Sequence, residues 1–426
     1  MFVGFFGTNV LFWDEWVIVP LLKKLVSGTL TFGDLFGMHN EHRMFFPRLV
    51  QLGVVAITHN YNSVSFMYLI QVCLLMTLAV FYLKAKRQFK FERLPFWFLL
   101  IPCFVFNWRQ WENLLSGFQI TFVMPLFFGV LSLYFLDSHA ASQFDRSIKQ
   151  SYWPFIGAVL SAIVASFSMS MGLLIWPTGI VCLLFTEKNR LKIPSILAWS
   201  MLALLTWRLY FFETPLLSLF QSHKTDTSLL LYGKYFLSLI GAFFYDEPHA
   251  LMYGVALLAL FALTCGIAWR QNILGAHVFW LSSGIYSLGV LAAITFGRAP
   301  FGSAFIMWSR YSTYTFPLLI SLYMLSVATA HHQRRKKFAL PVNILCGIVS
   351  GLLVWGIAVS SMKGFNDGRS TKIYMEKAAQ TLLNYRAASS QELTILYPSA
   401  EFVKQYAPFL ETRQYSVFHN HRSVKR

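Results

Sequence analysis

The chain has 426 residues, of which 56% are hydrophobic and only 12% are charged. Together with a mean hydropathy of +0.53, this composition excludes an ordinary soluble globular protein. Repeated apolar runs approach the roughly 20 residues that span a bilayer. They predict an all-α polytopic membrane protein.

The formal net charge of +17 would suit a nucleic-acid-binding protein, but its distribution does not. Basic residues concentrate in three short loops, at 84–93, 188–192 and 334–337. Short loops rich in Lys and Arg mark the cytoplasmic side of a membrane protein. We therefore expect these loops in the cytoplasm and expect no nucleic-acid partner.

The N-terminal segment Met1–Phe12 is apolar but shorter than a full span. We expect a truncated or partial first helix with a cytoplasmic N-terminus. Residues 13–62 then form the first external loop, where Phe45–Thr58 is expected to lie as a helix on the membrane surface.

The remaining spans follow from the apolar runs and from the sidedness of the basic loops. Residues 152–185 are too long for one span and are expected to divide at SFSMSMG (166–172) into two short helices. Leu229–Tyr245 is expected to lie against the outer face. Counted with the first helix, the spans number about eleven and form a transmembrane domain over residues 1–362. The other spans are expected at 63–83, 94–107, 117–136, 193–212, 250–268, 276–297, 313–330 and 339–362.

Residues 363–426 are predicted to form a small external α/β segment. Ser370–Ala388 and Ala400–Leu410 have helical patterns. The stretches LTILYP (393–398) and YSVF (415–418) are typical of strands.

The placement of charge points to the outer face. None of the 18 acidic residues falls inside a proposed span, whereas ion-coupled transporters usually keep carboxylates at membrane depth. Secondary transport is therefore disfavoured. Acids and arginines gather instead in the proposed external loops, as Asp14, Glu15, Glu41, Arg43, Arg48, Arg109, Glu112, Arg298 and Arg310.

This combination of groups suits a particular chemistry. A carboxylate at the membrane surface can act as general base toward a hydroxyl. Arginines can bind a phosphate through two parallel hydrogen bonds. We expect transfer of a sugar from a lipid-phosphate carrier to a hydroxyl acceptor such as a cell-surface glycan. The donor headgroup is expected to contact His39, His42, Arg43, Arg48, Arg298 and Arg310, with Glu41, Arg109 and Glu112 as further candidates.

Several segments also resemble a known family. FWDEWVIVP (12–20), directly after the first hydrophobic segment and before a long external loop, resembles the GT-C superfamily of integral-membrane glycosyltransferases. More narrowly, LFGMHNEHRMFFPRL, WENLLSGFQ, the late SRY and the terminal YSVF are similar to a group of bacterial multi-pass proteins placed with those enzymes. The resemblance covers nearly the whole chain.

The resemblance implies a polyprenyl- or dolichyl-phosphate sugar as donor and the bacterial cytoplasmic (inner) membrane as the location. Asp14 matches the acidic residue that these enzymes carry in the first external loop and is the expected base. Glu15, its neighbour, is able to exchange roles with it. The short first helix departs from the family pattern.

Structural roles compete with these functional ones. Asp14 would equally cap the helix that follows, Glu15 would complement its dipole, and Arg43 and Arg48 would face anionic lipid headgroups. His39 and His42, three positions apart, could hold a metal from one helical face. No further Cys or His partner is evident, so a divalent metal or other cofactor is not indicated.

Two other functions remain open. One is an O-antigen-type polymerase or ligase, which would be expected to carry its main external loop late in the chain. The other is a lipid or sugar flippase, which would need a polar path between the helices.

Overall fold

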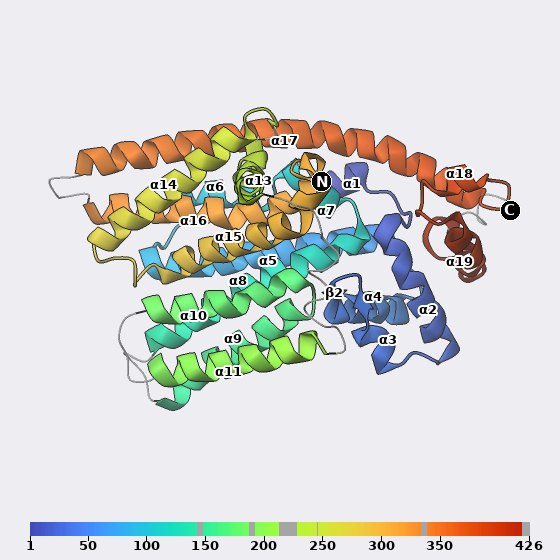
Figure 1. Ribbon diagram of the computed structural model, residues 1–426, viewed down its shortest axis with the longest axis horizontal. Coiled ribbons are helices and arrows are strands. Elements are labelled where there is room, and N and C mark those ends of the chain that lie inside the picture. Colours follow the sequence, from blue (N-terminus) through green and yellow to red (C-terminus); the bar gives the residue numbers. More distant parts are fainter. Residues whose placement is uncertain (143–147, 187–191, 213–227, 245, 334–338, 420–426) are drawn as a thin grey trace.

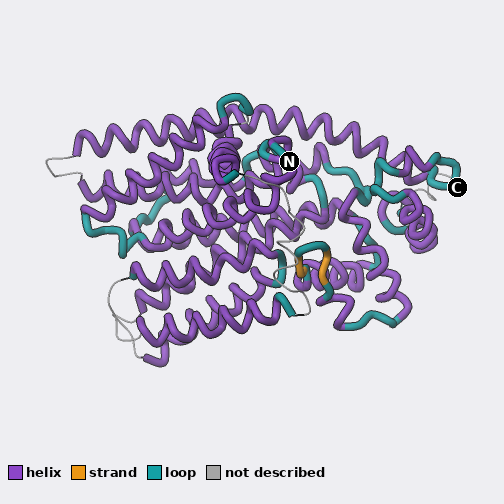
Figure 2. Tube along the Cα trace, viewed as in Figure 1, coloured by secondary structure: helices purple, strands orange, loops and turns teal. Residues whose placement is uncertain are grey.

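The computed structural model describes residues 1–142, 148–186, 192–212, 228–244, 246–333 and 339–419. In these residues the protein is almost entirely helical, with a single two-stranded hairpin. The long helices run side by side along the longest axis of the molecule (Figures 1 and 2).

Seven of the described helices are long and apolar enough to cross a membrane. This confirms the all-α membrane class, while the expected count of about eleven spans is not confirmed. The seven are α5 (Ser63–Phe89), α8 (Ile120–Ser142), α11 (Lys192–Tyr210), α14 (Ala250–Arg270), α15 (Val278–Arg298), α16 (Ser309–Gln333) and α17 (Ala339–Leu383). Shorter apolar helices include α1 (Phe2–Phe6), α6 (Leu100–Val105), α9 (Ile148–Ser166), α10 (Ile175–Phe185) and α13 (Leu229–Gly241).

The centre of the bundle is held by α16, which is buried along most of its length. Hydroxyl groups form hydrogen bonds between α16 and its neighbours, because apolar packing alone does not fix the orientation of one helix against another. Tyr314 donates to the carbonyl oxygen of Phe122 in α8 at 2.8 Å, and Ser321 donates to that of Trp280 in α15 at 2.6 Å. These bonds fix how α8 and α15 sit against α16.

One face of α17 carries a small residue at every fourth position. Gly356, Ser360, Gly364 and Gly368 lie on one helical stripe. A Cβ at Gly364 would collide with the carbonyl oxygen of Trp108. The stripe therefore allows α17 to lie directly against the chain near Trp108.

Beyond the bundle, the first loop and the C-terminal tail share a second hydrophobic core. We call residues 13–62 together with 384–419 the cap. It contains α2 (Ile18–Ser27), α3 (Phe32–Phe36), α4 (Phe45–Thr58), α18 (Ser390–Leu393) and α19 (Ala400–Arg413). The helix α17 extends past the bundle and carries the tail to the first loop (Figure 1).

The predicted α/β tail is wrong, because the described part of the tail contains no strand. LTILYP covers the end of α18 and the turn after it, and YSVF contains a short 3-10 helix, Ser416–Phe418. The buried residues recur at helical spacing, and this burial overrides the strand preference of single residues. They are Leu393, Leu396, Ala400, Val403, Ala407 and Leu410. Moreover, α17 runs unbroken across the expected boundary at 362/363.

The expectation that no acidic residue lies inside a span is also wrong. Asp137 belongs to α8, within the membrane-spanning stretch, and is buried. Its Oδ2 lies 2.6 Å from Nζ of Lys84 in α5. Lys84, expected in a cytoplasmic loop, is therefore the buried ion-pair partner of Asp137.

Candidate functional site

The stretch HNEHR forms a β-hairpin, β1 (Met38–His39) and β2 (His42–Arg43), in which His39 is directly opposite His42. Asn40 takes a positive φ of 50°, a conformation that Asn tolerates better than most residues. The two histidines therefore do not share a helical face, which the alternative of a metal held from one such face requires. The turn carries Glu41 at the tip of the hairpin.

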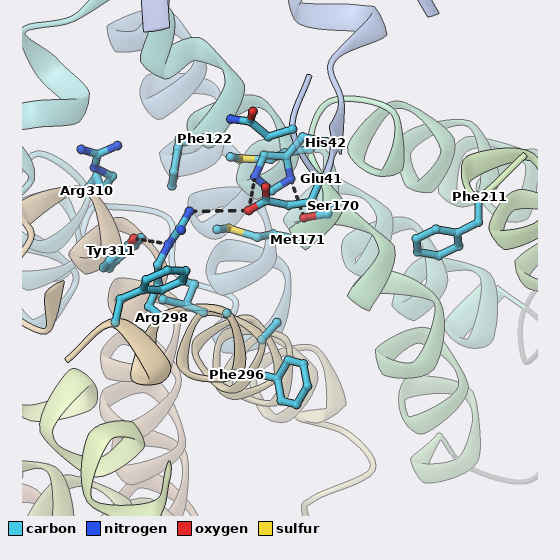
Figure 3. Close-up of a pocket in the computed structure, with 16 residues that line it drawn as sticks. Glu41, His42, Phe122, Ser170, Met171, Phe211, Phe296, Arg298, Arg310 and Tyr311 are labelled. Carbon is cyan, nitrogen blue, oxygen red and sulfur yellow. Dashed lines mark hydrogen bonds and ion pairs between the residues drawn. The ribbon is translucent and has the colours of Figure 1, made fainter. Parts of the chain in front are cut away.

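The hairpin tip enters a cavity of about 560 Å³. Most of its wall is apolar, with a few charged and polar groups at one side (Figure 3). The lining residues come from the hairpin, the start of α8, the segment after α9, the residue after α11, the end of α15 with the turn after it, and the start of α16. They include Glu41, His42, Phe122, Ser170, Met171, Phe296, Arg298, Arg310 and Tyr311.

Glu41 is held from two sides inside this cavity. Its Oε1 lies 3.5 Å from Nη2 of Arg298 and 3.5 Å from Nε2 of His42. Arg298 is itself oriented by Tyr311, whose hydroxyl accepts from Nε at 3.2 Å. Both of these charge contacts use Oε1 of Glu41.

Burial and charge set the protonation of this pair. Burial lowers the pKa of His42 to about 4, so the imidazole is neutral near pH 7. Burial raises the pKa of Glu41, but the His42 imidazolium that forms in acid, the backbone N–H of Glu41 and the charge of Arg298 together outweigh it and hold that pKa below its ordinary value. The carboxylate is therefore ionised at neutral pH.

Ser170 lies on the other side of His42, with its Oγ 2.8 Å from Nδ1. It begins the 3-10 helix η5 (Ser170–Leu174), which continues directly into α10. A Cβ at Gly172 would collide with the carbonyl group of Ala165 in α9, so glycine allows η5 to turn back closely. The stretch SFSMSMG predicts only the division between two helices, so Ser170 was not among the predicted site residues.

Arg310 reaches the cavity from the start of α16. Its guanidinium carbon lies 4.3 Å from the ring centre of Trp308. Glu112 accepts from the Arg310 backbone N–H at 2.9 Å and from the Ser309 hydroxyl at 3.0 Å. Glu112 therefore acts at the N-terminus of α16, where a negative charge is favourable. Its Oε1 also lies 3.5 Å from Nη2 of Arg310, although Glu112 itself is not in the cavity wall.

Arg43 has a structural role. It is buried, and its guanidinium donates to the carbonyl oxygens of Phe36, Tyr210 and Phe212. Tyr210 is the last residue of α11, where carbonyl groups lack helical partners and a cation is favourable. Arg43 thus holds the base of the hairpin against the end of α11.

Arg48 and Arg109 are buried in the same way. Arg48 donates to the carbonyl oxygens of Leu35 and Gly37 at 2.9 and 2.6 Å. Arg109 donates to those of Ala242 and Met307 at 3.1 and 2.8 Å. The expectation that Arg43 and Arg48 hold a donor phosphate therefore gains no support, since neither lines the large cavity.

The two acids of WDEW lie apart from the cavity wall. Glu15 is 1% exposed and accepts from the Tyr61 hydroxyl at 2.8 Å. Burial raises its pKa to about 7, while hydrogen bonds from Ser63 and Tyr61 oppose the rise. Asp14 is partly exposed. Burial lowers the pKa of His39 in the hairpin, and the negative charge of Asp14 opposes this shift.

Within the described residues, no group of three His, Cys, Asp or Glu side chains is arranged to hold a metal ion. Of the residues predicted for the site, the structure brings four together in the cavity wall: Glu41, His42, Arg298 and Arg310. No protein-family model, curated protein or solved structure matches the chain.

Proposed function

We propose that this protein is an integral-membrane glycosyltransferase that takes a sugar from a polyprenyl-phosphate carrier and transfers it to a hydroxyl acceptor. The observation that carries the proposal is the cavity shared by Glu41, Arg298 and Arg310. Two guanidinium groups and one carboxylate stand at one side of a wall that is otherwise mostly apolar. An amphiphile with an anionic headgroup matches this arrangement, with its headgroup at the guanidinium groups and its chain along the apolar wall.

The position of the cavity supports the same class of ligand. Arg298 ends α15, Ser309 begins α16 and Ile120 begins α8, so the cavity lies where three long helices begin or end. The cap lies at this end of the bundle (Figure 1). A lipid phosphate has its headgroup at the end of the membrane-spanning stretch, with its chain along the apolar helices.

In the proposed reaction, Arg298 and Arg310 bind the phosphate and stabilise its charge as the bond from the sugar carbon to the phosphate oxygen breaks. The acceptor oxygen bonds to that carbon, and its proton passes to Oε2 of Glu41. Oε1 stays with Arg298 and His42, which keeps the carboxylate in place. Asp14, the base expected from the family resemblance, is not part of this proposal, because it does not line the cavity.

The N-terminal helix α1 lies toward the cap end of the bundle, where Phe2 stacks on Trp108, so the expected cytoplasmic N-terminus is not part of the proposal. The proposed orientation places the cap outside a bacterial inner membrane. It is supported by the basic residues at the far end of the bundle from the cap, such as Lys86 and Arg87 at the end of α5 and Arg270 at the end of α14. A flippase, the rival function, would need a polar path through the bundle. The buried charges Lys84 and Asp137 pair with each other inside the bundle, so they do not support such a path.

The test is sugar transfer by the full chain in lipid nanodiscs, with radiolabelled polyprenyl-phosphate sugars as donors. Glu41→Gln should lower the rate about 10²- to 10⁴-fold, the usual effect of losing a general base. Arg208→Ala, which removes an exposed arginine outside the cavity wall, is the matched control and should leave the rate unchanged. Equal rates in wild type and Glu41→Gln would contradict the proposed mechanism.

A further inference from the structure

Ser170, His42 and Glu41 form a continuous hydroxyl–imidazole–carboxylate chain in the cavity wall (Figure 3). Ser170 Oγ lies 2.8 Å from His42 Nδ1, and His42 Nε2 lies 3.5 Å from Glu41 Oε1. The three side chains come from two places, the hairpin tip and the start of η5, which lie more than a hundred residues apart in sequence.

The carboxylate decides which ring nitrogen carries the proton. An ionised Glu41 has no hydrogen to donate, so its charge 3.5 Å from Nε2 favours the tautomer of neutral His42 that carries its hydrogen on Nε2. Nδ1 then has a free lone pair that faces the Ser170 hydroxyl. A serine whose hydroxyl meets the basic nitrogen of an imidazole, itself oriented by a carboxylate, is an activated nucleophile.

We propose that Ser170 is a catalytic nucleophile that accepts an acyl group from an ester with an apolar chain, with His42 as base and Glu41 as the group that orients it. This activity goes beyond the proposed sugar transfer and does not rest on it. It uses Oε1 of Glu41, whereas sugar transfer uses Oε2.

The step balances without any further reactant. Ser170 Oγ bonds to the carbonyl carbon of the ester, and the hydroxyl proton moves to His42 Nδ1. The bond from that carbon to the ester oxygen breaks, and the departing alcohol takes the proton from Nδ1. An acceptor hydroxyl or water then attacks the acyl carbon and gives its proton to His42 Nδ1. The bond from that carbon to Ser170 Oγ breaks, and Oγ takes the proton back from Nδ1.

Charge and shape at the site suit this donor. The guanidinium of Arg298 contacts Glu41 beside Ser170 and supplies positive charge near the oxyanion that forms on the carbonyl oxygen. Ser170 is also the first residue of a helical segment that continues through α10, and the N-terminus of a helix favours negative charge. Phe122, Met171 and Phe296 give the cavity the apolar wall that an acyl chain needs.

The experiment is covalent labelling of the full chain in nanodiscs with a biotinylated alkyl fluorophosphonate, followed by mass spectrometry of the labelled peptide. The expected result is phosphonylation of Ser170. Ser170→Ala should abolish this label, and His42→Gln should slow it about 10²- to 10⁴-fold. Ser303→Ala removes an exposed serine outside the cavity wall and should label as wild type does.

A second readout tests the ester. Hydrolysis of p-nitrophenyl dodecanoate should exceed that of p-nitrophenyl acetate and should disappear in Ser170→Ala. Labelling of Ser170 no faster than that of Ser303, in a protein with the wild-type melting temperature, would overturn the proposal. Neither the labelling nor the ester hydrolysis uses a sugar donor, so both test the acyl-transfer proposal even if the sugar-transfer assay fails.

Discussion

The backbone N–H of Trp13 donates a 2.7 Å hydrogen bond to the carbonyl oxygen of Leu396. A second bond of 2.7 Å joins the N–H of Ser416 to the carbonyl oxygen of Tyr61. Both connect the first loop to the C-terminal tail, so the cap is built from the two ends of the chain. The tail therefore stabilises the loop that carries the hairpin and Glu41.

This shared core predicts the effect of a cavity-forming substitution. Leu410 is fully buried in the cap, and Leu410→Ala should lower the free energy of unfolding by about 2–5 kcal/mol. The measurement is thermal unfolding followed by tryptophan fluorescence, with limited proteolysis of the tail. Leu94→Ala, at a half-exposed position, is the control. Equal melting temperatures for both variants would show that the tail does not pack against the loop.

Glu15 predicts a pH dependence of stability. Its pKa is about 7 in the folded protein, above its ordinary value of 4.5, so the folded state favours the protonated acid. The contribution is fully present below about pH 4.5 and is lost as pH rises toward 7. The loss amounts to roughly 3 kcal/mol for a shift of this size. Glu15→Gln stays neutral, so its melting temperature should fall less than that of wild type between pH 5 and 8. Parallel curves of melting temperature against pH for the two proteins would contradict a buried, protonated Glu15.

Arg43 should behave as a structural residue. Arg43→Ala leaves three backbone carbonyl groups without their charged donor, each bond being worth about 1.5–3 kcal/mol. Arg43→Lys should recover only part of the loss, because an ammonium group lacks the planar fork. Melting temperature is the measurement, with Arg298→Ala as comparison, since that half-exposed side chain faces the cavity. A stable Arg43→Ala protein that fails only in ligand binding would restore the headgroup role.

The sidedness of the membrane can be measured by labelling single cysteines in a chain whose five native cysteines have been replaced. Cysteines introduced at Ser303 and Gln391, both exposed, should react with an impermeant maleimide from outside intact cells. A cysteine at Lys90 should react only after the membrane is opened. The reverse pattern would invert the proposed topology.

Local properties were predictable from the sequence, and properties set by distant contacts were not. The long helices follow from continuous apolar length, which is read directly from the residues. Single-residue preference predicts a strand at 393–398, whereas the spacing of Leu393, Leu396 and Ala400 is helical. This helical spacing produces an apolar face that is stable only because the first loop supplies a surface against which it packs.

The candidate site divides in the same way. Glu41, Arg298 and Arg310 were predictable as charged groups in loops of a chain with little charge. The cluster HNEHR gave no sign that Arg43 would hold the end of α11, because the carbonyl groups that it binds are backbone atoms far along the chain. Ser170 was missed for a related reason: its partner His42 lies in another loop, and a single serine carries no spacing signal.

Binding of a lipid phosphate tests the central claim most directly, because it requires the cavity and no particular sugar. Calorimetry with farnesyl phosphate and farnesol should show that wild type prefers the phosphate. Arg298→Ala with Arg310→Ala should weaken farnesyl phosphate binding by at least about tenfold for each charge-assisted bond lost, while Arg208→Ala binds as wild type does. Farnesol binding as tightly as its phosphate, or unchanged affinity in the double variant, would contradict a lipid-phosphate site at Glu41, Arg298 and Arg310.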